Sequence, residues 1–439
     1  MSNISPNSYN GITLTTSEIN ALTDLEQLLQ QHQCLYEGET IPIVTSEGMA
    51  ENNIGFYAQD NRVTALTVRY CTLTSLPNSL AGLSNLQVLD VTGNQLTSLP
   101  ETFGDLSHLQ KLYADANQLT SLPASLENLT ELVELHLDRN RLTALPARID
   151  RLTNLNTLNV YGNALETVPE SLGSLTGLTE ISLGHNQLLF LPASFWHLTD
   201  LHLLNIAENR LTSLPENIGN LTHLHTLDIA HNELTSLPAS LGNLTKLTHF
   251  LYISNNHLAS LPASLFDNLD KLTYLNITDN QLSSLPDSFG NLTGLKELRI
   301  YNNQLTALPE SLGALSNLRE LYVMNNRLVS LPASFGKLEN LKEANLSNNR
   351  LTSLPESLSS LTHLTRLDLR NNRLTTLPAS LGNLKSLTHL DLRANKLLSL
   401  PTCIKELTNL EKLDLRWNKI ARLPGWVEEL EERECVVYR

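Results

Sequence analysis

The hydrophobic positions of this 439-residue chain repeat along most of its length. The phrase L-x-x-L-x-L-x-x-N-x-L-x-x-L-P recurs from Leu86 to Pro424, and its Asn returns every 23 residues, apart from two steps of 24. One earlier unit carries Cys71 where the others carry Asn, which gives 16 units in all. A period of this length predicts a solenoid, because no single unit can bury its leucines without a neighbour. The repeated asparagines are Asn94, Asn117, Asn140, Asn163, Asn186, Asn209, Asn232, Asn256, Asn280, Asn303, Asn326, Asn349, Asn372, Asn395 and Asn418.

Each part of the repeat has a physical reason. The alternation in Leu-x-Leu predicts a short strand with one buried face. The side chain of Asn both donates and accepts, so a stack of asparagines can satisfy backbone groups that would otherwise be buried without partners. The Leu-Pro pair then bends the chain into an extended segment, since Pro has a fixed φ and no N–H to offer a sheet. Residues six, four and two positions before each Asn point away from the core, and we call the surface they form the strand face.

The two ends differ from the repeat and predict caps. Thr15 and Glu18 form a capping-box pattern, followed by apolar residues at helical spacing, which predicts an amphipathic helix over residues 16–31. We expect residues 1–62 to be an N-terminal cap, 63–425 the solenoid and 426–439 a C-terminal cap. Caps are needed because an open solenoid end exposes its core.

The repeated L-P-x-S-L-G-x-L-x-x-L phrasing resembles the leucine-rich repeat family, and in particular its intracellular Ras-group members, over about residues 63–425. The resemblance implies an α/β solenoid: a right-handed leucine-rich repeat horseshoe of about 16 rungs with a parallel β-sheet on its concave face. In this fold the strand face is the concave face. The family also implies that this face binds a protein partner.

The net charge and the patterns that would direct a chain to a membrane or to secretion limit the possible functions and locations. Lys and Arg number 30 against 45 Asp and Glu, a net charge of −15, so we expect no nucleic-acid partner. No Lys or Arg precedes Arg62, and no apolar run reaches the roughly 18 residues of a membrane span, so we expect a cytoplasmic monomer without membrane insertion. The four cysteines show no CxxC spacing and no cluster with His, and therefore predict neither a zinc site nor a disulfide framework.

Motifs of enzymes are missing from the sequence. The single Gly-Lys pair, Gly336-Lys337, is followed by Leu338 where a phosphate-binding loop needs Ser or Thr. The histidines near the strand face have partners that change from rung to rung, which is typical of solvated side chains. We therefore expect no catalytic residue, no metal and no cofactor.

Aromatic residues gather at one place on the predicted strand face. Six of the 11 tyrosines occupy strand-face positions, and four of them come from four consecutive rungs. Tyr and Arg dominate binding hot spots, although Tyr also simply favours strands. One 24-residue step places an extra residue within 248–253, where it predicts a bulge or else a harmless length variant. The predicted partner site consists of Tyr252, Tyr274, Arg299, Tyr301, Tyr322 and Met324.

A second strip near the C-terminus is charged. The last rungs carry Asp four residues before the Asn and Arg two residues before it. We expect the two columns to pair across rungs as an exposed ion ladder; the alternative is a docking strip for an acidic partner. The aspartates are Asp368, Asp391 and Asp414, and the arginines are Arg370, Arg393 and Arg416.

These patterns favour a non-enzymatic protein–protein interaction scaffold with a role in signalling. Two alternatives remain open. One is an exported effector or surface adhesin of bacterial type that uses the same face outside its own cell. The other is a subunit that regulates a GTPase in trans.

Overall fold

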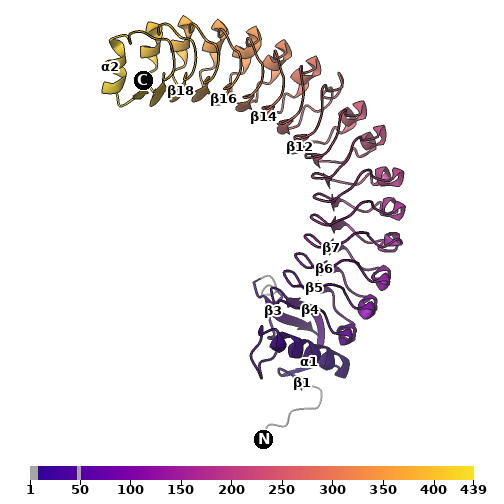
Figure 1. The fold of residues 1–439 in the computed structure, drawn as a ribbon. Helices are drawn as coiled ribbons and strands as arrows, with labels where there is room; N and C mark the ends of the chain where they lie inside the picture. The colour runs from indigo at the N-terminus through magenta and orange to yellow at the C-terminus, as the bar shows by residue number, and fades with distance from the viewer. Residues whose placement is uncertain (1–7, 47–50) are drawn as a thin grey trace. The chain divides into compact units, whose positions relative to one another are not determined.

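The computed structural model describes residues 8–46 and 51–439 and divides into two units, Met1–Arg210 and Leu211–Arg439. In each unit short parallel strands stack on one side and short 3-10 helices on the other (Figure 1). Each unit is described by itself. Among the described residues, no helix has both the length and the apolar character that crossing a membrane requires.

Unit 1 begins with non-repetitive structure. The strands β1 (Ser8–Tyr9) and β2 (Ile12–Thr13) form an antiparallel hairpin. Helix α1 (Thr16–Gln31) follows, with the predicted capping box: the Glu18 amide donates to the Thr15 hydroxyl, and the Thr15 amide donates to the Glu18 carboxylate. Its buried face packs on the 3-10 helix η2 (Asn78–Gly82).

An antiparallel pair leads into the parallel stack of unit 1. Strand β3 (Ile54–Gln59) pairs with β4 (Arg62–Val68), and the latter starts the parallel pairing with β5. The buried Glu18 carboxylate of α1 accepts a hydrogen bond from the Val63 amide, 3.0 Å away, so the helix is fastened to the first rung. The later strands of unit 1 are three residues each: β5 (Val88–Asp90), β6 (Lys111–Tyr113), β7 (Glu134–His136), β8 (Thr157–Asn159), β9 (Glu180–Ser182) and β10 (Leu203–Asn205).

Unit 2 continues the same strand pattern. Its strands are parallel, and each pairs with the next so that equivalent repeat positions face one another, as Leu298 faces Leu321. They are β11 (Thr226–Asp228), β12 (Phe250–Tyr252), β13 (Tyr274–Asn276), β14 (Glu297–Arg299), β15 (Glu320–Tyr322), β16 (Glu343–Asn345), β17 (Arg366–Asp368), β18 (His389–Asp391), β19 (Lys412–Asp414) and β20 (Val436–Tyr438).

Of the two alternatives for the extra residue within 248–253, the bulge does not form and the harmless length variant is confirmed. Strand β12 pairs with β11 and β13 without a register shift. The extra residue is Thr248, which lies between the buried Leu247 and the start of the strand. Its insertion is absorbed before the strand begins, so the side chains of β12 keep the alternation of the other rungs.

Short 3-10 helices follow the Leu-Pro pairs, and the Pro precedes the helix in almost every rung because its fixed φ suits that position. Besides η2 they are η3 (Glu101–Asp105), η4 (Ala124–Asn128), η5 (Ile149–Arg151), η6 (Glu170–Ser174), η7 (Ala193–His197), η8 (Glu216–Asn220), η9 (Ala239–Asn243), η10 (Asp287–Asn291), η11 (Glu310–Ala314), η12 (Ala333–Lys337), η13 (Glu356–Ser360), η14 (Ala379–Asn383) and η15 (Thr402–Glu406).

The core lies between the strands and the 3-10 helices. Strand leucines are fully buried, and five buried phenylalanines enlarge the side of the 3-10 helices, among them Phe289 and Phe335. Helix α2 (Trp426–Glu432) and β20 end unit 2, where β20 pairs in parallel with β19. Helices therefore occur in both predicted caps, while the boundaries at 62 and 426 stay predictions.

Candidate partner-binding surface

The strand face is a single layer of side chains on the sheet. Along β14, Glu297 and Arg299 are half-buried on this face, and Leu298 between them is fully buried in the core. Adjacent strands of a parallel sheet lie about 4.8 Å apart, so side chains from neighbouring rungs touch. The surface is therefore continuous within each unit, although its residues are far apart in the sequence.

The side chains of the repeated asparagines form hydrogen bonds with backbone groups of their own and the preceding rung, and Asn303 is typical. Its side-chain oxygen accepts from the Leu282 amide at 3.0 Å, and its Nδ2 donates to the Ile277 carbonyl at 3.0 Å. The same nitrogen also meets the Ile300 carbonyl, 3.3 Å away. One side chain thus connects two rungs and fixes where each strand turns into the core. Thirteen of the fifteen repeated asparagines are buried, and Asn163 and Asn418 are half-buried.

Three aromatic rings meet on β12 and β13. The rings of Phe250 and Tyr252 stack with centroids 5.8 Å apart, and Tyr274 lies 5.6 Å from Phe250 and 5.2 Å from Tyr252. The Phe250 side chain is nevertheless 41 % exposed. An exposed ring of this size in a strand-face position has no part in the core, so it is available to a partner.

Arg299 extends this group across two further strands. Its guanidinium lies 5.7 Å from the Tyr274 ring centroid and 5.4 Å from that of Tyr322. Glu297 fixes it through an ion pair of 2.6 Å, and the Tyr322 hydroxyl donates to Glu320 at 2.9 Å. The arginine is thus pre-positioned between two rings. We call Phe250, Tyr252, Tyr274, Arg299 and Tyr322 the aromatic cluster.

The cluster differs from the predicted site at both edges. Phe250 belongs to it, although the prediction counted tyrosines as its only aromatic rings; its position six residues before Asn256 was the signal that could have revealed it. Tyr301 and Met324 are half-buried two residues beyond the ends of their strands, at the margin of the ring contacts. The structure thus brings four of the six predicted residues into one contact group.

The cluster hydroxyls stay protonated near neutral pH. Burial raises the pKa of Tyr274 to about 12, and burial also raises the pKa values of Tyr252 and Tyr322. For Arg299, burial alone would lower the pKa, but the hydrogen bond to Glu297 and the nearby Tyr274 outweigh it and raise the pKa. The cluster therefore offers ring faces and neutral hydroxyls around one positive charge.

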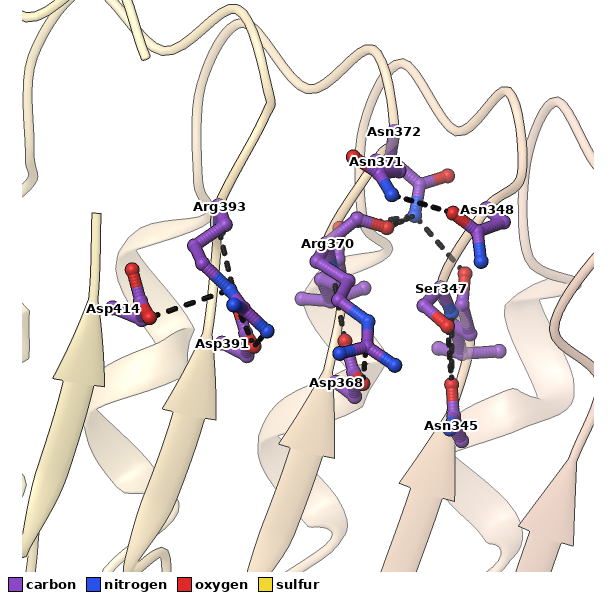
Figure 2. A network of polar contacts seen from close by, with 12 residues as sticks. Asn345, Ser347, Asn348, Asp368, Arg370, Asn371, Asn372, Asp391, Arg393 and Asp414 are labelled. Atoms are coloured by element: carbon purple, nitrogen blue, oxygen red, sulfur yellow. Dashed lines mark hydrogen bonds and ion pairs between the residues drawn. The ribbon is translucent and has the colours of Figure 1, made fainter. Parts of the chain in front are cut away.

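The charged strip is an ion ladder within rungs (Figure 2). Each Arg pairs mainly with the Asp two residues before it, and a single contact, from Arg393 to Asp414 at 3.3 Å, crosses between rungs. The cross-rung pairing expected from the sequence is therefore mostly wrong. The reason is local: in each case the carboxylate also accepts from the backbone amide of its own Arg, which keeps it on its own rung. The pairs are Asp368–Arg370 at 3.3 Å, Asp391–Arg393 at 2.6 Å and Asp414–Arg416 at 2.6 Å.

Beside the ladder, the strand face is hollowed over β16–β19, with a volume of about 190 Å³. Charges of both signs line the hollow, including Glu343 and Asp368 against Arg366 and Lys412. Because the arginines of the ladder are already paired and the hollow has no single sign of charge, this region shows no simple docking site for an acidic segment.

The strand face of unit 1 carries a polar network instead. The Tyr113 hydroxyl and the Lys111 ammonium group both contact Glu134, each at 2.7 Å, and the Tyr113 ring lies 4.7 Å from that of His136. The Glu134 carboxylate is thus shared between a tyrosine hydroxyl and a lysine ammonium group. In the described part of the chain, His, Cys, Asp and Glu nowhere gather in threes that could hold a metal ion.

Comparison with known families and structures agrees with this geometry. The family description "Leucine rich repeat" matches residues 130–188, 153–211, 249–305, 316–374 and 362–420. "Leucine-rich repeat region" matches 63–140 and 192–273, and "Leucine Rich repeats (2 copies)" matches 293–335. A comparison with curated proteins finds no sequence match.

Solved structures share the fold. A leucine-rich repeat protein of Leptospira interrogans is 33 % identical, with a TM-score of 0.77 over 91 % of this chain and 100 % of that chain. The plant peptide hormone receptor RGFR1, solved with RGF2, is 26 % identical, with a TM-score of 0.64 over 83 % and 64 % of the two chains. Drosophila Toll, solved with Spatzle, is 26 % identical, with a TM-score of 0.67 over 79 % and 49 %. The chain therefore belongs to the leucine-rich repeat family.

Proposed function

We propose that this protein is a non-enzymatic scaffold that binds a protein partner on the strand face of unit 2, with the aromatic cluster as the centre of the site. The observation that carries the proposal is the cluster itself: Phe250 exposed beside Tyr252 and Tyr274, with Arg299 held over the rings. Rings of this kind bury a large area at little cost in side-chain entropy, and such anchors are each worth about 2 kcal/mol or more.

The chemistry of the aromatic cluster limits which surfaces of a partner can bind to it. Its exposed surface is apolar and aromatic, and its one positive charge is already paired with Glu297. Neighbouring strand-face positions carry Glu320 and Glu343, which face one another across β15 and β16. A complementary partner presents an apolar or aromatic residue to Phe250 and basic residues to these carboxylates.

The family supports the proposal in general terms. Leucine-rich repeat proteins typically serve as scaffolds and receptors for protein partners, and they are generally non-enzymatic. Two of the similar structures are complexes with a protein or peptide, RGFR1 with RGF2 and Toll with Spatzle. For this chain we propose a monomer that acts in the cytoplasm, in signalling, without a cofactor.

The test is a differential capture. Wild-type protein and the double variant Phe250→Ala/Tyr274→Ala are used as baits, and partners are compared by quantitative mass spectrometry. A specific partner should be recovered with the wild type and lost with the variant. The matched control is Tyr113→Ala, which removes a strand-face tyrosine of unit 1 outside the cluster and should leave recovery unchanged.

The isolated partner then gives the energetic test. Single changes of Tyr252 and Tyr322 to Ala should each weaken binding by about 1–3 kcal/mol, and a change of Tyr301 to Ala by less, because Tyr301 lies at the margin. If all three bind within about 0.5 kcal/mol of wild type while Arg393→Ala abolishes binding, the cluster is not the site and the charged strip is.

A further inference from the structure

Two cysteines that are 37 residues apart in the sequence meet where the first rung joins the N-terminal segment. The Cys34 thiol, in the loop after α1, lies 3.0 Å from the Cys71 carbonyl oxygen. Cys71 occupies the ladder position of the first rung, where every later rung carries Asn. Burial, and after it the neighbouring Cys34 side chain, raises the pKa of Cys71 to about 12.

The local structure explains why a cysteine stands at this position. An Asn in the ladder donates to the carbonyl of the preceding rung, as Asn94 donates to the Val68 carbonyl at 2.7 Å. The first rung has no preceding rung whose carbonyl its ladder residue could bind. The loop after α1 lies there instead and places the Cys34 thiol against the Cys71 carbonyl oxygen. The Cys71 amide is still bound by the ladder, since it donates to Asn94 at 3.0 Å.

We propose that Cys34 and Cys71 form a dithiol that low-molecular-weight disulfides such as glutathione disulfide oxidise to an internal disulfide. Both sulfurs are held by the fold, because their backbones and side chains are bonded to different elements of one junction. Cys34 donates its backbone amide to the Leu29 carbonyl of α1, and the Cys71 thiol donates to the Arg69 carbonyl at 3.2 Å. A pair fixed in this way reacts as an intramolecular pair, with a high effective concentration.

The exposure of the two thiols sets the order of the steps. Cys34 is half-buried and reachable, and Cys71 is 1 % exposed. The Cys34 thiolate attacks one sulfur of glutathione disulfide and releases one glutathione thiolate. The Cys71 thiol, which its raised pKa keeps protonated near neutral pH, loses its proton as it attacks the Cys34 sulfur and releases the second glutathione, so this second step is the slower one. Two electrons and two protons pass from the cysteine pair to the oxidant, and the protein becomes lighter by two hydrogen atoms.

The cross-link has a structural and a diagnostic consequence. It fastens the loop after α1 to the first rung, at the end where the solenoid core needs cover. A reducing cytoplasm keeps such a pair as thiols, whereas an oxidising compartment closes it. The redox state of the pair in acid-quenched native protein therefore separates the proposed cytoplasmic location from an exported one.

The test treats folded full-length protein with glutathione disulfide, blocks remaining thiols with N-ethylmaleimide, and maps peptides without reduction. Wild type should yield a peptide pair linked through Cys34 and Cys71. The variant Cys71→Asn, which places the usual ladder residue in the first rung, should fold and accumulate glutathione on Cys34. The variant Cys34→Ser should leave Cys71 reduced because of its burial.

The matched control is the double variant Cys403→Ser/Cys435→Ser, which should form the same link as wild type. Three outcomes overturn the proposal: glutathione on Cys34 of wild type without an internal link, a link that forms only in denaturant, or no reaction of either thiol in the folded protein. A link in wild type that both single variants lose establishes it.

Discussion

Removal of one ladder asparagine should destabilise unit 2 far more than a surface change of the same type. Asn303→Ala deletes the acceptor of the Leu282 amide and the donor to the Ile277 and Ile300 carbonyls, in a fully buried setting. A buried group left without its partner costs about 1–3 kcal/mol. The amide alone sets a lower limit of about 1 kcal/mol, and together with the carbonyls we expect a loss of about 2–5 kcal/mol.

The matched control is Asn317→Ala. This asparagine also donates to a carbonyl of the previous rung, that of Thr293 at 2.8 Å, but it is exposed on the side of the 3-10 helices. Water replaces its partner, so the change should cost less than about 1 kcal/mol. Because solenoids can unfold locally, denaturant unfolding is followed together with hydrogen exchange of the Leu282 amide. If Asn303→Ala is no less stable than Asn317→Ala, or the Leu282 amide keeps its protection, the ladder does not hold the rungs as argued.

Three further predictions concern unit 1, one rung of unit 2 and the N-terminal cap. Burial and the nearby Asp90 carboxylate raise the pKa of Asp115 to about 6, although the Asp138 amide lowers it. The stability that the protonated Asp115 contributes is therefore fully present below about pH 4 and is lost as the pH rises through 6. Asp115→Asn should be more stable than wild type by up to about 2 kcal/mol at pH 8 and equally stable at pH 4. Denaturant unfolding measured at both pH values checks this. Ala344 fills a buried strand position that is leucine in the paired strands β15 and β17, so amides of 341–349 should exchange faster than those of 364–372; equal protection would contradict a packing defect there. Deletion of residues 1–62 should expose the first rung and cause aggregation, and a truncated monomer with an unchanged melting curve would show that this segment is no cap.

Because the sequence repeats, the architecture of the solenoid could be predicted from the sequence. A fixed period gives both the strand positions and the side on which each residue points, because the rungs are bonded in equivalent register. The capping box at Thr15 was readable for a similar reason, since it depends on residues three positions apart. Local and periodic signals therefore predicted the strands, the ladder positions and α1.

Contacts that depend on side-chain conformation or on distant segments could not be read in this way. The period shows that there is an extra residue near β12, but it does not show that this residue is Thr248 and lies before the strand. Whether the Asp–Arg pairs of the charged strip form within a rung or across rungs depends on a backbone contact. Each Asp carboxylate accepts a hydrogen bond from the backbone amide of the Arg two residues later, as Asp391 does from Arg393. Cys34 lies outside the repeat, so no spacing rule connects it with Cys71.

These cases separate residues that the fold requires from residues that it merely carries. Asn303 and Leu298 recur in almost every rung because the stack cannot form without them, and they say nothing about a partner. Cys71 departs from the repeat, and Phe250 occupies a strand-face position that the repeat leaves variable, so the stack requires neither residue. A residue that the stack does not require and that nevertheless has specific contacts, as Phe250 has with Tyr252 and Tyr274, is not explained by the needs of the stack. In a solenoid, function is therefore best sought where the repeat does not require a residue and a neighbouring rung or segment contacts that residue.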